Sequence, residues 1–166
     1  MRQPGGQNGF TLIELVVAVS LFTLVIGAAL SLYQQGVLAW QRGEKGVDVQ
    51  ENLRLGLDRM SRELRTATVL REAKVNSVKF DTAYAKTVRY YYDPVKGQLM
   101  REVDGGSNPL ASCVTGLSLK YYNKNGEEKT GEDLSEITLV RIILEGKKGD
   151  LKPLKLTTSV RIRARE

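Results

Sequence analysis

Two of the side-chain types that often carry out chemistry, histidine and cysteine, are absent or nearly absent from this chain of 166 residues. Histidine is absent, which removes the commonest general base and the commonest transition-metal ligand. Cys113 is the single cysteine, so neither an intrachain disulfide nor a thiolate metal cluster can form. The sequence contains no phosphate-binding loop, metal-binding motif or nucleophile elbow. We therefore predict that the protein is not an enzyme and needs no metal or cofactor.

The most informative charged side chain is Glu14, because it lies near the start of a long apolar run. Residues 10–33 read FTLIELVVAVSLFTLVIGAALSLY and contain no other charge. As a helix they would be about 36 Å long, enough to cross a hydrocarbon layer of about 30 Å. A carboxylate inside such a helix costs roughly 2.5–3.5 kcal/mol at the centre and less near an end. The run predicts a transmembrane helix, and the presence of a charged residue, Glu14, within it requires an explanation.

Three other interpretations of the apolar run are open. A buried core helix is disfavoured, because the rest of the chain could hardly enclose so long a cylinder. A secretory signal peptide has a similar order of segments, and Gly27-Ala28-Ala29 could serve as its cleavage site. Its apolar region, however, is usually only about 7–15 residues long, and an acidic residue at its start is unexpected. Finally, Glu14 could simply mark the edge of a span that starts at Leu15.

The residues around Glu14 form a motif. After a short polar segment, residues 9–18 read GFTLIELVVA, which resembles the prepilin cleavage and methylation motif of type IV pilins, type II secretion pseudopilins and competence pseudopilins. The resemblance implies that a membrane-embedded aspartyl peptidase cuts after Gly9 and methylates Phe10 as the new N-terminus. It also implies that Glu14 guides the incorporation of the subunit into a filament.

Electrostatics support that role for Glu14 independently. Cleavage after Gly9 would place Glu14 in the first turns of a helix, where the positive end of the helix dipole favours a carboxylate. In a bundle of such helices, Glu14 could pair with the terminal amine of a neighbouring subunit. Because a buried charge costs most when it is unpaired, such pairing would favour one axial register of the subunits over the others.

A second helical pattern follows the apolar run. Between Gln41 and Arg71, apolar residues recur at helical spacing with charged residues between them: Val49, Leu53, Leu57, Met60 and Leu64. Residues 51–67 (ENLRLGLDRMSRELRTA) are similar to the corresponding stretch of J-type minor pseudopilins and PilW-like minor pilins. We expect this apolar face to pack against a sheet. We also expect Gly36, Gly43 and Gly46 to soften the helix where the two patterns join.

From about Val75 the pattern changes to the alternation typical of strands. Residues 88–92 and 98–103 predict a hairpin around a proline and glycine turn, and residues 114–122 and 137–144 predict two further strands, the second of them central. Residues 151–164 alternate, with an apolar face that we expect to pack against the long helix. The opposite face of this strand is basic: Lys155, Arg161, Arg163 and Arg165.

The basic strand lies in the most positively charged part of the chain. The net charge is +6, and residues 147–166, with seven basic and two acidic side chains, contribute +5 of it. Such a segment could contact an anionic partner such as DNA or a lipid surface. A solvated strand face is the favoured interpretation, since the aromatic side chains that stack on bases are missing from this strand. For the acidic residues at 127–133 we likewise favour a solvated loop over a calcium site.

Together these patterns predict an α+β pilin fold, a long N-terminal helix packed on an antiparallel β-sheet. We expect a leader peptide at residues 1–9, a transmembrane and assembly helix at 10–33 and an amphipathic helix at 34–71 that continues into the globular domain. Residues 72–166 then form the β-rich part of that domain. The resemblance implies a minor pilin or pseudopilin that helps to initiate a filament, or lies at its tip, in secretion, motility or DNA uptake.

The resemblance also implies partners and a location. The partners are the prepilin peptidase, other pilin-like subunits, an inner-membrane assembly platform and membrane lipid. The chain would cross the inner membrane once, with a cytoplasmic N-terminus and a periplasmic or extracellular C-terminal domain. Two alternatives come from other classes: a membrane-tethered binding domain that is not cleaved after Gly9, and a competence subunit that captures DNA through the basic strand.

Overall fold

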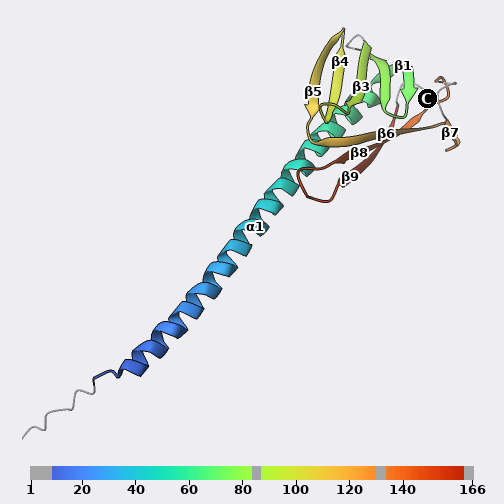
Figure 1. The fold of residues 1–166 in the computed structure, drawn as a ribbon. Helices are drawn as coiled ribbons and strands as arrows, with labels where there is room; N and C mark the ends of the chain where they lie inside the picture. The colour runs from blue at the N-terminus through green and yellow to red at the C-terminus, as the bar shows by residue number, and fades with distance from the viewer. Residues whose placement is uncertain (1–8, 84–86, 130–133, 163–166) are drawn as a thin grey trace, which may run out of the picture. The chain divides into compact units, whose positions relative to one another are not determined.

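The computed structural model describes residues 9–83, 87–129 and 134–162. The chain divides into two compact units, Met1–Gly43 and Glu44–Glu166. A single helix, α1 (Leu12–Arg65), supplies most of the first unit and opens the second (Figure 1). Its turns continue through Gly36, Gly43 and Gly46 without interruption, so the three glycines do not break the helix as a hydrogen-bonded element.

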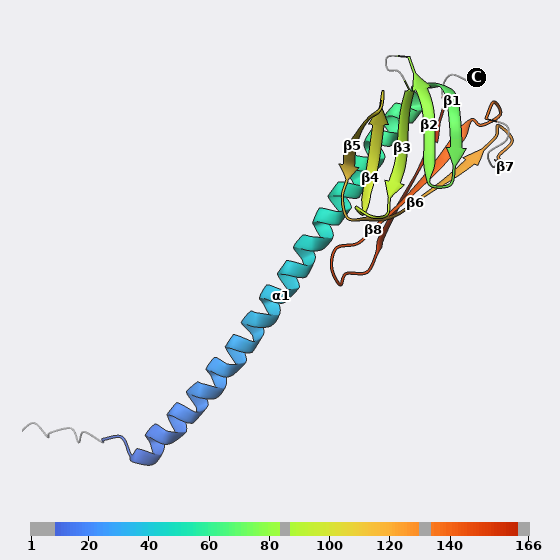
Figure 2. The same ribbon diagram turned by 45° about the horizontal axis from the view of Figure 1, so that its top comes forward.

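Two antiparallel sheets follow the helix in the second unit, where one sheet was predicted. Sheet A has the order β1-β2-β3-β4-β5, and its strands lie side by side in Figure 2. Sheet B has the order β7-β6-β8-β9. The strands of sheet A are β1 (Ala67–Lys74), β2 (Ser77–Thr82), β3 (Thr87–Asp93), β4 (Gln98–Val103) and β5 (Gly106–Ala111). Those of sheet B are β6 (Val114–Tyr122), β7 (Glu128–Lys129), β8 (Leu139–Gly146) and β9 (Leu154–Arg161).

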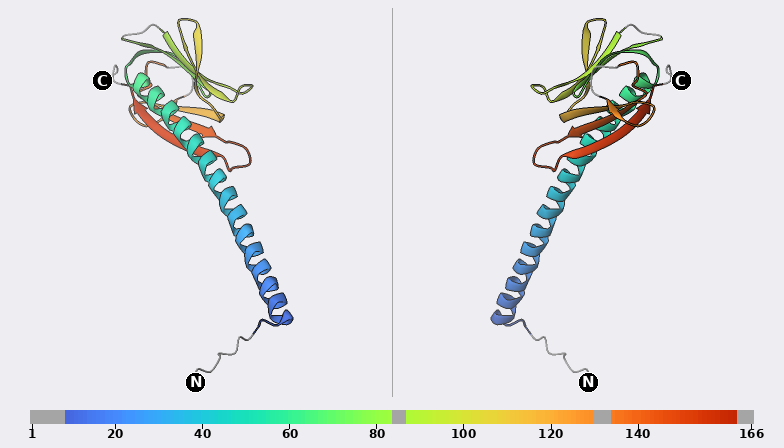
Figure 3. Two further views of the ribbon diagram at one scale, coloured as in Figure 1. Left: turned by 90° about the vertical axis from the view of Figure 1, so that its left-hand side faces the viewer. Right: turned by 90° about the vertical axis from the view of Figure 1, so that its right-hand side faces the viewer.

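The predicted apolar face of the helix, called the apolar stripe below (Val49, Leu53, Leu57, Met60 and Leu64), lies at the centre of the core. All five stripe residues, from Val49 to Leu64, are buried and belong to one cluster with apolar residues of both sheets. Figure 3 shows the C-terminal turns of α1 beside the two sheets. The helix and the sheet approach each other closely at Gly146 in β8, where an added Cβ would lie 2.9 Å from a methyl carbon of Leu53 and 2.7 Å from the carbonyl oxygen of Cys113. Only glycine fits there, because the helix and the turn before β6 both touch the strand.

The helix ends earlier than the sequence pattern predicted. It stops at Arg65, whereas we expected it to continue to residue 71, and β1 occupies residues 67–74. At the end, both the backbone N–H and the hydroxyl of Thr66 donate to the carbonyl of Glu63, at 3.1 and 2.9 Å. These bonds close the last turn, and the β-branched residues Thr66, Thr68 and Val69 then favour an extended chain. The residues around Arg65 also favour a helix, so the periodicity of the sequence did not show the change from helix to strand.

The other predicted strands are present with small shifts. The hairpin pairs β3 with β4, and Asp93 accepts the backbone N–H groups of Val95 and Lys96 at the turn. Residues 114–122 form β6, as predicted. The central strand β8 begins two residues later than the predicted start at 137 and lies between β6 and β9. Strands β1, β2, β5 and β7 were not predicted as separate strands.

A charged cluster joins the helix to sheet A. The carboxylate of Glu63 accepts both the hydroxyl of Tyr90 at 2.9 Å and Nε of Arg101 at 2.9 and 3.1 Å. Tyr90 is fully buried, while Glu63 and Arg101 are about one-fifth exposed. Burial, together with the negative charge of Glu63, raises the pKa of Tyr90, so this phenol remains a proton donor. The cluster therefore fixes the last turns of α1 over β3 and β4.

Replacing Glu63 by glutamine should lower the free energy of unfolding by about 2 kcal/mol, because it removes the charge from hydrogen bonds of a partly buried cluster. Urea denaturation of the full-length protein in detergent micelles, followed by near-ultraviolet circular dichroism, measures this change. Glu51→Gln is the matched control, since Glu51 lies on the exposed face of the same helix. Equal losses for the two variants would contradict a stabilising role for the cluster.

Candidate processing and assembly site

The N-terminus of α1 is capped by the residue that directly precedes the helix, Thr11. The backbone N–H of Leu15 donates to the carbonyl of Thr11 at 3.2 Å, which is the first hydrogen bond of the helix. The backbone N–H of Glu14 points to Oγ1 of Thr11, with 3.4 Å between nitrogen and oxygen. Thr11 is therefore the N-cap residue, and Glu14 is the third residue of the helix.

Thr11 is the functional residue that the sequence prediction missed. A threonine followed three positions later by a glutamate is the capping-box pattern, and Thr11-Leu12-Ile13-Glu14 fits it. That signal was available from the sequence but was hidden by the stronger signal of the cleavage motif. The cap places Glu14 in the first turn, next to the N–H groups that have no partner within the helix. A carboxylate is stabilised in this position, as the electrostatic argument required.

Gly9 and Phe10 precede the helix and are accessible. Neither residue is helical, both are exposed, and 85% of Phe10 is open to solvent. Exposed, non-helical segments next to a regular element are typical sites of proteolysis. A Cβ added to Gly9 would meet no atom within 4 Å, so nothing in the described part of this chain requires glycine there. A requirement for glycine at this position would therefore have to come from the active site of a peptidase.

The first part of α1 has the properties of a membrane anchor. An 18-residue window in its apolar part has a mean hydropathy of 2.5, and none of that window is buried within the chain. An apolar helix of this length and exposure fits a single-pass anchor joined to a C-terminal β domain. Residues 1–8, which belong to the predicted leader, lie outside the described part of the chain.

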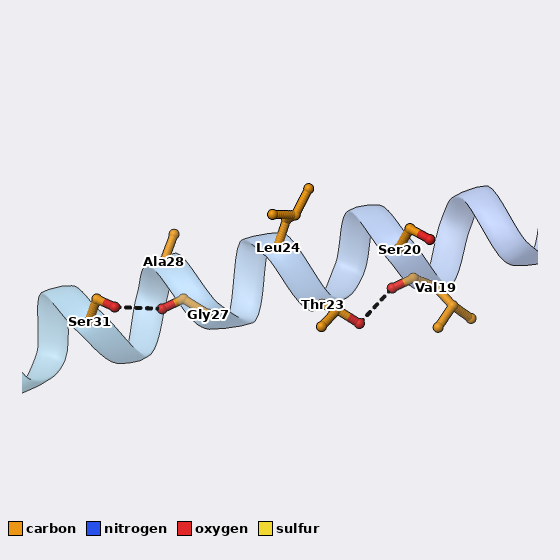
Figure 4. Close-up of a pocket in the computed structure, with 7 residues that line it drawn as sticks. All are labelled: Val19, Ser20, Thr23, Leu24, Gly27, Ala28 and Ser31. Atoms are coloured by element: carbon orange, nitrogen blue, oxygen red, sulfur yellow. Dashed lines mark hydrogen bonds between the residues drawn. The ribbon is translucent and has the colours of Figure 1, made fainter.

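The polar side chains of the anchor helix find partners within the helix itself. The hydroxyls of Ser20, Thr23 and Ser31 donate to the carbonyls four residues earlier, at 2.8, 2.8 and 2.9 Å. Figure 4 shows two of these bonds along a shallow groove that also includes Gly27. Small residues in such a groove allow another helix to approach closely, and satisfied hydroxyls add little cost in lipid. The surface suits packing among helices.

The structure describes two of the four basic residues predicted near the C-terminus, Lys155 and Arg161. Lys155 is exposed but forms an ion pair with Glu145 on β8, with 3.1 Å between nitrogen and oxygen. Arg161 is exposed on the outer face of sheet B. Arg163 and Arg165 lie outside the described residues. The prediction that β9 alternates between an apolar and a basic face is confirmed from Leu154 to Ile162.

The outer face of sheet B also contains an aromatic residue that the strand pattern did not associate with β9. Tyr122 on β6 pairs with Leu139, which pairs in turn with Arg161. The guanidinium of Arg141 lies 5.2 Å from the centre of the Tyr122 ring. An aromatic ring and two arginines are thus brought onto one face by sheet pairing, which cannot be read from a single strand.

The acidic loop residues have ordinary local partners where they are described. Glu127 accepts from Nδ2 of Asn123 at 2.7 Å, and Glu128 pairs with Lys120 at 3.1 Å. Within residues 9–83, 87–129 and 134–162 there is no group of three or more His, Cys, Asp or Glu side chains placed to hold a metal ion. Glu132 and Asp133 belong to the part of the chain that is not described.

Comparison with known families agrees with the N-terminal geometry. Residues 5–30 match the prokaryotic N-terminal methylation motif. The motif indicates a type IV pilin-like subunit that is processed by a prepilin peptidase, and other pilin subunits and that peptidase are the partners it suggests. Families of this type are structural rather than catalytic. A search of curated proteins found no match to the chain.

Proposed function

We propose that this chain is a minor pilin or pseudopilin that is cut after Gly9, methylated on Phe10 and assembled into a type IV pilus-like filament or a type II secretion pseudopilus. The observation that carries the proposal is the capped helix start, in which an accessible Gly9–Phe10 bond directly precedes Thr11 and the first-turn residue Glu14. Cleavage there would remove the leader and leave the cap attached to the helix.

In the proposed filament, the exposed apolar turns of α1 pack against those of other subunits. The terminal amine of Phe10 and the carboxylate of a neighbour's Glu14 form the pair that fixes the axial register. The β domain faces the periplasm or the outside, and the N-terminus faces the cytoplasm before assembly. An inner-membrane platform extracts the subunit from the lipid. Similarity of residues 51–67 to J-type minor pseudopilins and PilW-like minor pilins supports a role in initiation or at the tip.

Isolation of filaments from cells that produce the full-length protein tests this role. After shearing, the processed subunit should be found in the filament fraction in amounts far below the major subunit, and its deletion should reduce filament number rather than filament length. Immunogold labelling should mark filament ends. A subunit distributed evenly along filaments would contradict a role at the tip.

A second candidate function, DNA capture, is favoured by one observation. The face that includes Arg161 also includes Tyr122 and Arg141, a combination that can bind phosphates and stack on bases. The ion pair of Lys155 with Glu145 weakens this candidate, since it reduces the positive charge of the face. DNA retention that remains unchanged after neutralising Arg161, Arg163 and Arg165 would count against it.

A further inference from the structure

The strand β9 ends sheet B without a neighbour on its outer side among the described residues. It pairs with β8 over eight residues in one unbroken register, from Leu139↔Arg161 to Gly146↔Leu154. A long, regular edge strand presents a row of backbone donors and acceptors to which another extended chain can bind. The edge therefore has the geometry of a strand-addition site.

The other described edges are protected in ways that β9 is not. On the far side of sheet B, β7 has two residues, and the exposed stretch of β6 is engaged, since the N–H of Leu119 donates to the carbonyl of Val75 at 2.7 Å. In sheet A, the pairing of β1 is interrupted by two register shifts, and β5 contains Pro109. Bulges and prolines are the usual protection of sheet edges. β9 has neither from Leu154 to Arg161.

The register determines which backbone groups of β9 face outward. Ile162 donates its N–H to the carbonyl of Thr138 on the β8 side, at 2.9 Å. In an antiparallel pair, successive residues direct their N–H and C=O groups alternately toward and away from the partner strand. Even-numbered residues of β9 therefore bond to β8. The residues that direct both groups outward are Lys155, Thr157, Ser159 and Arg161, and all four are exposed.

The side chains along this edge specify the chemistry of a partner. On the inner face, Leu154 and Leu156 are only half-buried although they pack against the core, so added apolar side chains would complete their cover. On the outer face, Lys155 and Arg161 stand at opposite ends of the strand. Lys155 already forms an ion pair with Glu145 of β8, so Arg161 carries most of the positive charge of this edge. Opposite charges on neighbouring strands stabilise pairing, and like charges directly opposite destabilise it.

We propose that the free edge of β9 is a docking site for an extended segment of another protein, apolar at alternate positions and acidic at positions opposite Lys155 and Arg161. Charge disfavours one pairing of this edge with a second copy of the chain. In an antiparallel β9–β9 pair centred on Thr158, Lys155 of each copy would face Arg161 of the other, which places like charges opposite each other twice. A pair centred on Thr157 would instead place Lys155 opposite Ser159 without that repulsion. Self-association is therefore a separate outcome of the test: a dimer in detergent that Ser159→Pro dissociates, measured by analytical ultracentrifugation, would overturn an acidic strand of another protein as the partner. This inference does not depend on cleavage after Gly9.

The test uses the full-length protein in detergent micelles and two fluorescent seven-residue peptides, acetyl-Glu-Val-Thr-Val-Thr-Val-Glu-amide and the same peptide with lysine in place of both glutamates. Fluorescence anisotropy should show binding of the acidic peptide at least about tenfold tighter than that of the basic peptide. Methylating the backbone nitrogens of both threonines, which would face β9, should weaken binding about tenfold or more. Methylating the nitrogen of the central valine, which faces away, should not.

Two protein variants separate the backbone edge from the charged face. Ser159→Pro removes one outward N–H that β8 does not use, and should weaken binding about tenfold, whereas Ser159→Ala should bind as the unaltered protein does. If Ser159→Pro fails to fold by circular dichroism, the methylated peptides still decide the question. Equal binding of acidic and basic peptides would overturn the proposal. So would binding that survives backbone methylation and is displaced by single-stranded oligothymidine, because the site would then be a polyanion-binding face.

Discussion

Replacing Glu14 by glutamine should leave cleavage after Gly9 intact and should lower incorporation of the subunit into filaments about 100-fold. Glutamine keeps the size of the side chain and can still approach the N–H groups of the first turn, so the helix start should persist. It cannot provide the negative charge that, in the proposed filament, pairs with the terminal amine of Phe10 in a neighbouring subunit. Loss of one partner leaves the other charge buried and unpaired, which costs about 3 kcal/mol or more.

The measurement for this variant compares the processed subunit in the membrane fraction with that in the sheared filament fraction, both by quantitative immunoblotting. Glu44→Gln is the matched control, since it removes an acidic residue of the same helix outside the apolar run. Incorporation of Glu14→Gln at the level of the control would show that the charge of Glu14 does not set the register. Failure of Glu14→Gln to be processed would move its role from assembly to recognition by the peptidase.

Replacing Leu53 by alanine should lower the free energy of unfolding of the β domain by about 3 kcal/mol and its Tm by about 10 °C. Leu53 is fully buried, and its methyl groups lie against Gly146, which has no side chain that could move into the cavity left by alanine. Leu55→Ala is a closely matched control, because the same substitution two residues away removes a side chain that is 58% exposed. That control should change stability by less than about 1 kcal/mol.

Thermal unfolding of both variants in detergent, followed by near-ultraviolet circular dichroism, makes the comparison. A loss in Leu55→Ala as large as that in Leu53→Ala would mean that burial in the core does not determine the contribution of these leucines to stability. The expected difference instead requires the stripe from Val49 to Leu64 to hold the two sheets together.

The helical half of the fold could be predicted from sequence because its signals are local. An uncharged run long enough to span lipid, and apolar residues at helical spacing, each define an element within a short window. The same locality explains the error at its end. Arg65, Ala67, Leu70 and Arg71 continue a pattern compatible with a helix, while the choice of strand is made by pairing between β1 and residues 77–82.

The division of the strands into two sheets could not be predicted, because it depends on contacts far apart in the chain. Tyr121 on β6 donates its hydroxyl to the carbonyl of Lys74 at 2.8 Å, and Leu119 donates to Val75, which joins sheet B to the turn after β1. No periodicity in either segment indicates such a contact. For the same reason the sequence did not show that Tyr122 and Arg161 share one face of sheet B, or that β9 is an edge strand of that sheet among the described residues.

The candidate site was predicted in part, for a physical reason. Gly9, Phe10 and Glu14 carry a fixed spacing that a sequence shows directly, whereas the ion pair of Lys155 required the register of β8 and β9. The N-cap at Thr11 is an intermediate case. The capping-box pattern is visible in the sequence, but it identifies a cap only when the first residue of the helix is known.

The central claim is that removal of the leader creates a free N-terminal amine at Phe10, close to Glu14 in the first turn of α1. Intact-mass and N-terminal analysis of the full-length gene product, purified from the membrane fraction of cells that contain a prepilin peptidase, tests it directly. The account predicts a chain that lacks residues 1–9 and begins with N-methylated Phe10. A membrane-bound chain that retains its first nine residues, or a soluble chain that lacks residues 10–33, would contradict it.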